Sequence, residues 1–195
     1  MMTIRLFLSA LLTTLSLGAQ PAHFTWSTRS SEAYKESLAF RMYSAESILA
    51  SIEREDPKNM AADLIKSEVL FIRTMVEERP EDRASLFNEF RIIIDRLKEL
   101  PVSSSRRFSS LGEVYLKRGV VNLQAQNNLS AARDFYWAYR SYEKAYELDS
   151  TRIAAQTGWG IVQVVAGAIP DDYQWYANLI GISGDPQLGQ RLLRI

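Results

Sequence analysis

Apolar residues recur every three or four positions along most of the chain, which is the spacing of an amphipathic helix. The first stripe follows Ser31 and is formed by Leu38, Met42, Ala45, Leu49 and Ile52. The next two stripes are Leu64, Val69, Ile72, Met75 and Val76, and then Leu86, Phe90, Ile93, Ile94, Leu97 and Leu100. Each stripe predicts one continuous helix that turns its apolar face towards a core.

Prolines separate the periodic segments from one another. Those that follow residue 30 all lie between segments: Pro57, Pro80, Pro101, Pro170 and Pro186. The same period predicts further helices at about residues 107–126, 130–148 and 151–168. Ser130 and Ser150 precede apolar runs and are predicted to be N-caps, because a serine side chain accepts from a free N–H group at a helix start.

The expected fold class is all-α. No segment shows the sustained alternation of apolar and polar residues that a half-buried strand requires. The predicted helices are joined by short turns, which force neighbours into antiparallel helical hairpins. Residues 102–105 are the best linker candidate, but a linker of this length is a helix connection and not a domain boundary. Residues 31–195 are therefore expected to form one domain of stacked hairpins.

The N-terminus has the pattern of a targeting segment. Residues 1–19 contain a single charge, Arg5, followed by a mostly apolar run from Leu6 to Leu17. This run is shorter than the roughly 20 residues that span a bilayer, but it suits a signal peptide. We expect cleavage near Gln20 and a periplasmic or secreted protein, with an uncleaved anchor as the alternative. Residues 20–30 are expected to form an extended leader.

Composition excludes several kinds of chemistry. The 195 residues include 23 basic and 23 acidic side chains, one histidine and no cysteine. Balanced charge gives no basic field for nucleic acid. Without cysteine there is no disulfide, no zinc–thiolate site and no thiol nucleophile, and His23 alone cannot form a histidine metal cluster. We therefore expect no metal, no cofactor and, once the signal peptide is removed, no membrane span.

Clustered acidic residues are the remaining candidates for catalysis. They are Glu53, Glu55 and Asp56, then Glu77 and Glu78, then Glu81 and Asp82, and finally Asp171 and Asp172. Each group lies at the end of a predicted helix, where solvated charge is expected. No serine lies in a Gly-x-Ser-x-Gly elbow, which would present it as a nucleophile. We expect no catalytic residue and conclude that the chain is not an enzyme.

Aromatic side chains are concentrated in residues 135–146 and again after Pro170. We predict that a subset lines a binding groove: Tyr139, Tyr142, Tyr146, Tyr173, Trp175 and Tyr176. Tyrosine and tryptophan anchor many protein interfaces, because they offer a large apolar area with a polar end. The alternative is a helix buried on two sides, in which these aromatics belong to the core.

The segment from Ala138 to Asp149 resembles the second helix of a tetratricopeptide repeat. Small residues stand at Ala138 and Ala145, and Tyr142 occupies the position of a large residue between them. Ala45, Leu49, Ile52 and Pro57 fit the same frame, and Leu111-Gly112-x-x-Tyr115 resembles the first-helix motif. Gly112 lies 26 residues before Ala138, about twice the ordinary separation in a repeat of about 34 residues. The resemblance implies a short α-α solenoid with overlong helices, and an ordinary helical bundle is the alternative.

Residues 158–195 carry a second resemblance. Gly158-x-Gly160, Ile169-Pro170, Leu179-Ile180-Gly181-x-x-Gly184-Asp185 and Gly189 form a constellation. It is similar to a segment of the eukaryotic inclusion-body clearance family of tetratricopeptide proteins, with Ile182 in place of the usual aromatic. The resemblance implies a scaffold or adaptor role and brings no catalytic residues. The family continues with further repeats, so the chain is compatible with being the front part of a longer solenoid.

The sequence therefore predicts an exported, non-enzymatic helical-repeat scaffold or adaptor. Its groove would bind another protein or a component of the cell envelope. The alternative is a helical module that binds carbohydrate or a small molecule on a Tyr/Trp platform.

Overall fold

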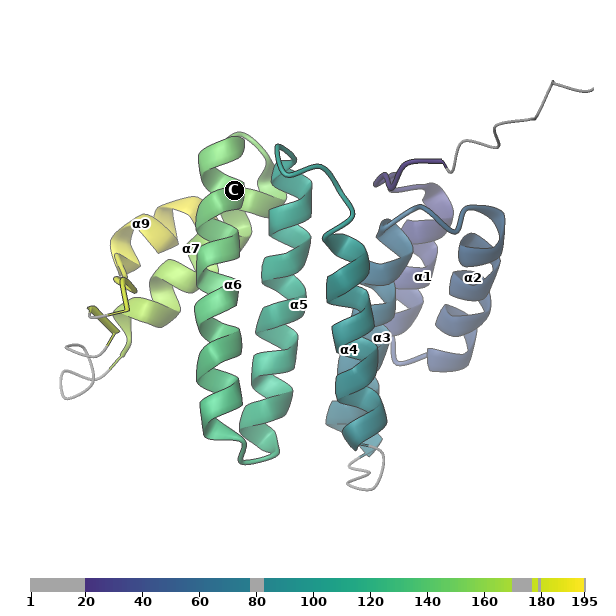
Figure 1. Ribbon diagram of the computed structural model, residues 1–195, viewed down its shortest axis with the longest axis horizontal. Helices are drawn as coiled ribbons and strands as arrows, with labels where there is room; N and C mark the ends of the chain where they lie inside the picture. Colours follow the sequence, from purple (N-terminus) through teal and green to yellow (C-terminus); the bar gives the residue numbers. More distant parts are fainter. Residues whose placement is uncertain (1–19, 78–82, 170–176, 179, 195) are drawn as a thin grey trace, which may run out of the picture.

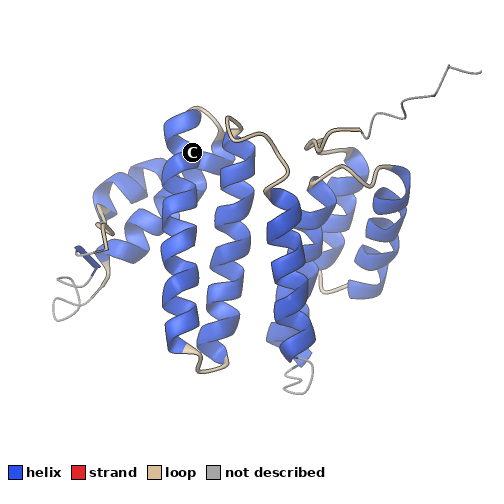
Figure 2. Ribbon diagram, viewed as in Figure 1, coloured by secondary structure: helices blue, strands red, loops and turns tan. Residues whose placement is uncertain are grey.

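The computed structural model describes residues 20–77, 83–169, 177–178 and 180–194. These residues are mostly helical and contain no β-strand (Figure 1 and Figure 2), so the all-α prediction is confirmed. The helices are α1 (Thr28–Leu38), α2 (Met42–Glu55), α3 (Ala61–Glu77), α4 (Arg83–Leu97), α5 (Ser105–Gln124), α6 (Asn128–Leu148), α7 (Ile153–Gly167) and α9 (Pro186–Leu193). The predicted signal peptide, residues 1–19, lies outside the described residues.

The helices stand side by side as a row of hairpins (Figure 1). α1 packs on α2, α3 on α4, α5 on α6, and α7 on α9. Each helix of the series α1, α3, α5 and α7 also packs on the next helix of that series. In the described part of the chain, α2, α4 and α6 make no contact with one another. The first helix of each hairpin therefore packs on both helices of the hairpin before it, while the second helices are separated.

The first predicted helix is two helices in the structure. α1 ends at Leu38 and α2 begins at Met42, so the prediction of one continuous helix is wrong. Phe40 has a φ of 59°, and its N–H donates to the carbonyl of Ser37 at 3.0 Å. A residue with left-handed backbone geometry commonly follows the last turn of an α-helix in this way. Residues with a side chain seldom adopt this backbone. The segment 39–41 contains no glycine, proline or asparagine, and its turn is therefore not visible in the pattern.

The turn between α5 and α6 repeats this geometry. Gln126 has a φ of 61°, and its N–H donates to the carbonyl of Leu123 at 3.0 Å. The turns that follow α2 and α6 also correspond, with Asp56 and Asp149 as the two C-caps. Equivalent positions are buried in both hairpins: Ala45 with Ala138, Leu49 with Tyr142, and Ile52 with Ala145. The first and third hairpins therefore have the same turn geometry and equivalent buried positions, and the helices of the third hairpin are longer.

Two of the N-caps differ from the prediction. Asn127 and Arg152 precede α6 and α7 in place of Ser130 and Ser150, so both predicted caps are wrong. Asp185 precedes α9, and its carboxylate accepts from the N–H of the third helical residue at 2.9 Å. Charge and hydrogen bonding therefore both favour this helix start.

The leader is shorter than predicted. Within the predicted range 20–30, Ser27 already caps α1 through a hydrogen bond at 3.0 Å from the N–H of Ser30. The preceding residues dock on the turn before α3. There the side-chain amide of Asn59 accepts from the N–H of Thr25 at 2.9 Å and donates to its carbonyl at 3.0 Å. These bonds fasten the leader to the first two hairpins.

Candidate partner-binding groove

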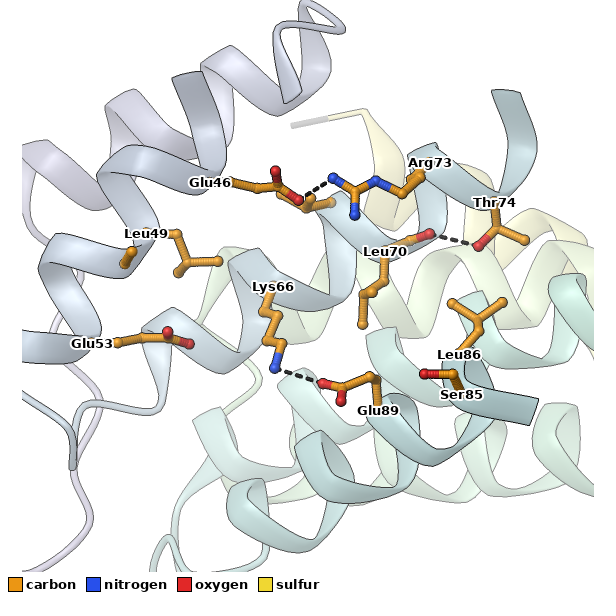
Figure 3. A pocket seen from close by; sticks show the side chains of 12 residues that line it. Glu46, Leu49, Glu53, Lys66, Leu70, Arg73, Thr74, Ser85, Leu86 and Glu89 are labelled. Carbon is orange, nitrogen blue, oxygen red and sulfur yellow. Dashed lines mark hydrogen bonds and ion pairs between the residues drawn. The ribbon is translucent and has the colours of Figure 1, made fainter. Parts of the chain in front are cut away.

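A groove lies between α2 and α4, with α3 as its floor. It has a volume of about 580 Å³ and is lined by side chains from these three helices. Its origin is the packing of the row, because α3 contacts both α2 and α4 while the latter two do not contact each other. Figure 3 shows the side chains that face this space.

The floor of the groove is apolar. Leu49 and Val69 are buried beneath it, and Leu70 and Leu86 remain partly exposed to solvent. α2 adds Ala50, whose small exposed side chain leaves the opening wide. A partner side chain placed here would remove apolar surface from water on both sides, which is worth about 25 cal/mol per Å².

Two ion pairs flank this floor. Glu46 of α2 pairs with Arg73 of α3, and Lys66 of α3 pairs with Glu89 of α4, with a nitrogen–oxygen distance of 2.6 Å in the latter. In Figure 3 the two pairs lie on either side of Leu70. All four groups keep part of their surface in water, so each pair contributes little to stability. Their charges can instead orient a bound segment.

Glu53 is the third carboxylate of the groove. Among the described residues it has neither an ion pair nor a hydrogen bond, although it lies half-buried at the α2 wall. Burial raises the pKa of Glu53 above its ordinary value; the Lys66 charge opposes this increase and the nearby carboxylates add to it. The groove therefore contains an acidic group whose charge is poorly compensated.

The groove has the chemistry of a binding surface. The hydroxyl of Thr74 donates to the carbonyl of Leu70 at 2.7 Å, so it is already engaged in the helix. Within the described ranges, no cluster of three or more histidine, aspartate or glutamate side chains is arranged to hold a metal ion. The lining offers apolar contact and charge, and no paired nucleophile and base.

The described tyrosines of the predicted groove lie elsewhere, between α6 and α7. Tyr139 and Tyr142 are each only 5% exposed and belong to a core cluster with Val162. The hydroxyl of Tyr139 donates to the carbonyl of Ser183 at 2.8 Å. Tyr146 is half-buried and stacks on Trp159, with ring centroids 6.4 Å apart. Tyr139 and Tyr142 therefore pack hairpins together, which is the core alternative considered from the sequence.

Glycines explain how Tyr142 fits between helices. A Cβ added to Gly112 of α5 would lie 2.9 Å from the Tyr142 ring, and one added to Gly158 of α7 would lie 1.9 Å from it. The ring is therefore held directly against two backbones. Tyr173, Trp175 and Tyr176, the other predicted groove residues, lie outside the described residues.

The sequence contained one signal for the observed groove. Glu46 and Glu53 are seven residues apart and so share one face of α2, beside the apolar stripe that contains Leu49. The sequence pattern alone places Glu53 in an acidic cluster at a helix end. Its location could not be inferred, because the separation of α2 from α4 depends on packing between hairpins.

A second polar cluster joins α3 to α5. Lys117 is 8% exposed, and its ammonium group donates to Glu68 and Glu113 at 2.6 Å each. Burial alone lowers the pKa of Lys117, but the two carboxylates outweigh it and raise the pKa above its ordinary value. Lys117 is therefore charged at neutral pH. The ammonium group donates to both carboxylates and to the hydroxyl of Ser67. Because Glu68 lies on α3 and Lys117 on α5, we assign the cluster to the interface between hairpins.

Comparison with protein-family models, curated proteins and solved structures finds no match to this chain. Among the described residues, no helix combines the length and apolar character needed to cross a membrane.

Proposed function

We propose that this chain is a non-enzymatic helical-repeat scaffold of the tetratricopeptide type that holds a segment of a partner protein in the α2–α3–α4 groove. The observation that carries this proposal is the groove itself, with an apolar floor between charged side chains. Protein interfaces combine an apolar centre with a polar rim in the same way. In this proposal residues 1–19 export the protein to the periplasm or the medium.

The repeat part of the proposal is supported by the packing of the hairpins. The first helix of each hairpin packs on both helices of the preceding hairpin, and the first and third hairpins share their turn geometry. Stacked helical hairpins are used widely to present extended binding surfaces. A carbohydrate-binding platform has less support, because Tyr139 and Tyr142 are buried.

Site-specific photo-cross-linking tests the proposal. A benzophenone amino acid is placed at Ala50 in the α2 wall of the groove, and at Ala154 in α7 as the control. Both positions are exposed alanines, so neither replacement removes buried contacts. We expect a polypeptide adduct in cells from position 50 that is absent from position 154. An adduct with only a small molecule at position 50 would favour the alternative function, and equal adducts at both positions would refute a specific groove.

A further inference from the structure

The charges around Glu53 do not balance. α2, α3 and α4 bring together three carboxylates, those of Glu53, Asp63 and Glu89, with two cations, Lys66 and Arg96. Lys66 pairs with Glu89 at 2.6 Å, and Arg96 donates from Nε to Asp63 at 2.7 Å. Both cations are thus engaged by other carboxylates. The cluster has one net negative charge, and it is located at Glu53.

On the buried side of the same cluster, one carboxylate oxygen also lacks a hydrogen-bond donor. Asp63 is 3% exposed, and its Oδ2 atom is buried without a hydrogen-bond partner. Arg96 donates to the other oxygen of Asp63, and one of its terminal nitrogens donates to the carbonyl of Pro57 at 2.7 Å. Burial raises the pKa of Asp63, which the hydrogen bond from Arg96 only partly offsets. An additional cation beside Glu53 would therefore be favourable for the whole cluster.

The open side of Glu53 is the groove, and the groove is where such a cation can come from. We propose that the bound segment carries a lysine or arginine side chain that pairs with Glu53, next to apolar side chains that pack on Leu70 and Leu86. This inference rests on the proposed function. The aliphatic stem of the basic residue would cover the apolar floor while its charged end reaches Glu53. Acidic segments would be repelled by the same carboxylate, which gives the groove selectivity.

Selection from a phage-displayed library of random peptides, with the complete chain as bait, provides the probe. We expect the selected peptides to be enriched in lysine or arginine beside leucine, isoleucine or phenylalanine. They should fail to bind Ala50→Trp, in which the groove is filled, and should bind Ala154→Trp normally. A synthetic copy of the strongest peptide is then compared with a copy whose basic residue is replaced by norleucine, using isothermal titration calorimetry.

Glu53→Gln isolates the proposed pair. We expect this variant to bind the basic peptide about tenfold more weakly and to bind the norleucine peptide as the original chain does. Glu55→Gln is the matched control, because Glu55 lies on the same helix, is exposed and pairs with Arg29. It removes the same charge and should leave both affinities unchanged. Glu53→Lys should reverse the preference, towards a peptide with glutamate in place of the basic residue.

The outcomes separate this inference from the proposed function. Peptides that require an open groove but show no basic enrichment, with equal affinity for Glu53→Gln, would overturn the inference and leave protein binding standing. Peptides that bind Ala50→Trp as well, or the absence of any enriched peptide, would overturn the proposed function and the inference with it. The norleucine comparison uses the unaltered chain, so its result is independent of how the Glu53 variants fold.

Discussion

The carboxylate of Glu53 is half-buried in the groove and forms no ion pair or hydrogen bond with the described residues. Because burial raises its pKa, the ionised form is less favourable in the folded chain than in the unfolded one. Between the ordinary pKa and the raised pKa, the folded chain binds more protons than the unfolded chain. The free energy of unfolding therefore falls as the pH rises through this window, and the loss persists above it.

Glu53→Gln removes the ionisable group and with it this pH-dependent decrease in the free energy of unfolding. At pH 7 we expect the variant to be more stable than the original chain by less than about 1 kcal/mol, since the side chain is partly exposed and water screens the charge. The difference should disappear below the ordinary value of 4.5, where Glu53 is protonated in both states. Urea unfolding at several pH values measures this difference in the free energy of unfolding. Glu55→Gln should not be more stable than the original chain at any of these pH values. A gain that grows towards low pH would contradict the assignment.

Individual side chains were the least predictable feature from sequence. Ala45, Ala138 and Ala145 lie on predicted apolar faces, and all three are fully buried. The sequence does not decide whether Tyr142 belongs to a groove or to the core, because its fit depends on glycines in two other helices. The apolar period of a sequence predicts which face of a helix is buried. It does not predict which neighbouring helix packs its backbone against that face.

At the scale of elements, α3 and α5 are joined by a charged contact as well as by packing. Lys117 of α5 lies between Glu68 of α3 and Glu113 of its own helix. Removing a buried cation leaves its carboxylates uncompensated, which costs more than the ion pair itself contributes. The contact therefore fixes the second hairpin against the third.

Lys117→Met should lower the free energy of unfolding by about 3–5 kcal/mol, because it leaves Glu68 and Glu113 without their counter-charge. Adding Glu68→Gln and Glu113→Gln to this variant should restore most of the loss. Lys144→Met is the control, since Lys144 is exposed and forms a surface ion pair with Glu147 at 2.9 Å. Denaturant unfolding provides the measurement. A loss below about 1 kcal/mol for Lys117→Met would mean that the cluster is well solvated.

The elements themselves were predicted well in the second half of the chain, where polar residues interrupt the apolar period at each turn. The helices predicted from residue 107 onwards begin and end within two residues of α5, α6 and α7. The α1–α2 break was missed, because Phe40 adopts a positive φ that its side chain disfavours. The Arg41–Glu36 ion pair across this turn helps to hold it. Such a turn is fixed by the packing of α1 on α2 and leaves no compositional signal.

At the scale of the whole molecule, the short turn before residue 130 correctly predicted that α5 and α6 pack together. The hairpin of α1 and α2 was missed, and the order in which the hairpins contact one another was not predicted. The groove follows from that order, since α2 and α4 are both held by α3 while remaining apart. Among the described helices, those of one hairpin pack only on those of the adjacent hairpins. Solenoid proteins have this arrangement, and their stability is the sum of local terms and interfaces. Damage to one interface should therefore remain local.

Tyr142→Leu tests this locality, because the ring of Tyr142 lies between Gly112 of α5 and Gly158 of α7. We expect a loss of about 2–3 kcal/mol, less than the 3–5 kcal/mol of truncation to alanine. Hydrogen–deuterium exchange should accelerate in α5, α6 and α7 and change little in α1 and α2, which share no contact with α6. Tyr43→Leu, at a position 88% exposed, is the matched control and should leave exchange unchanged throughout. Uniform acceleration from α1 to α9 would instead show that the chain unfolds as one cooperative unit, in which a change at the α6–α7 interface also reaches the groove.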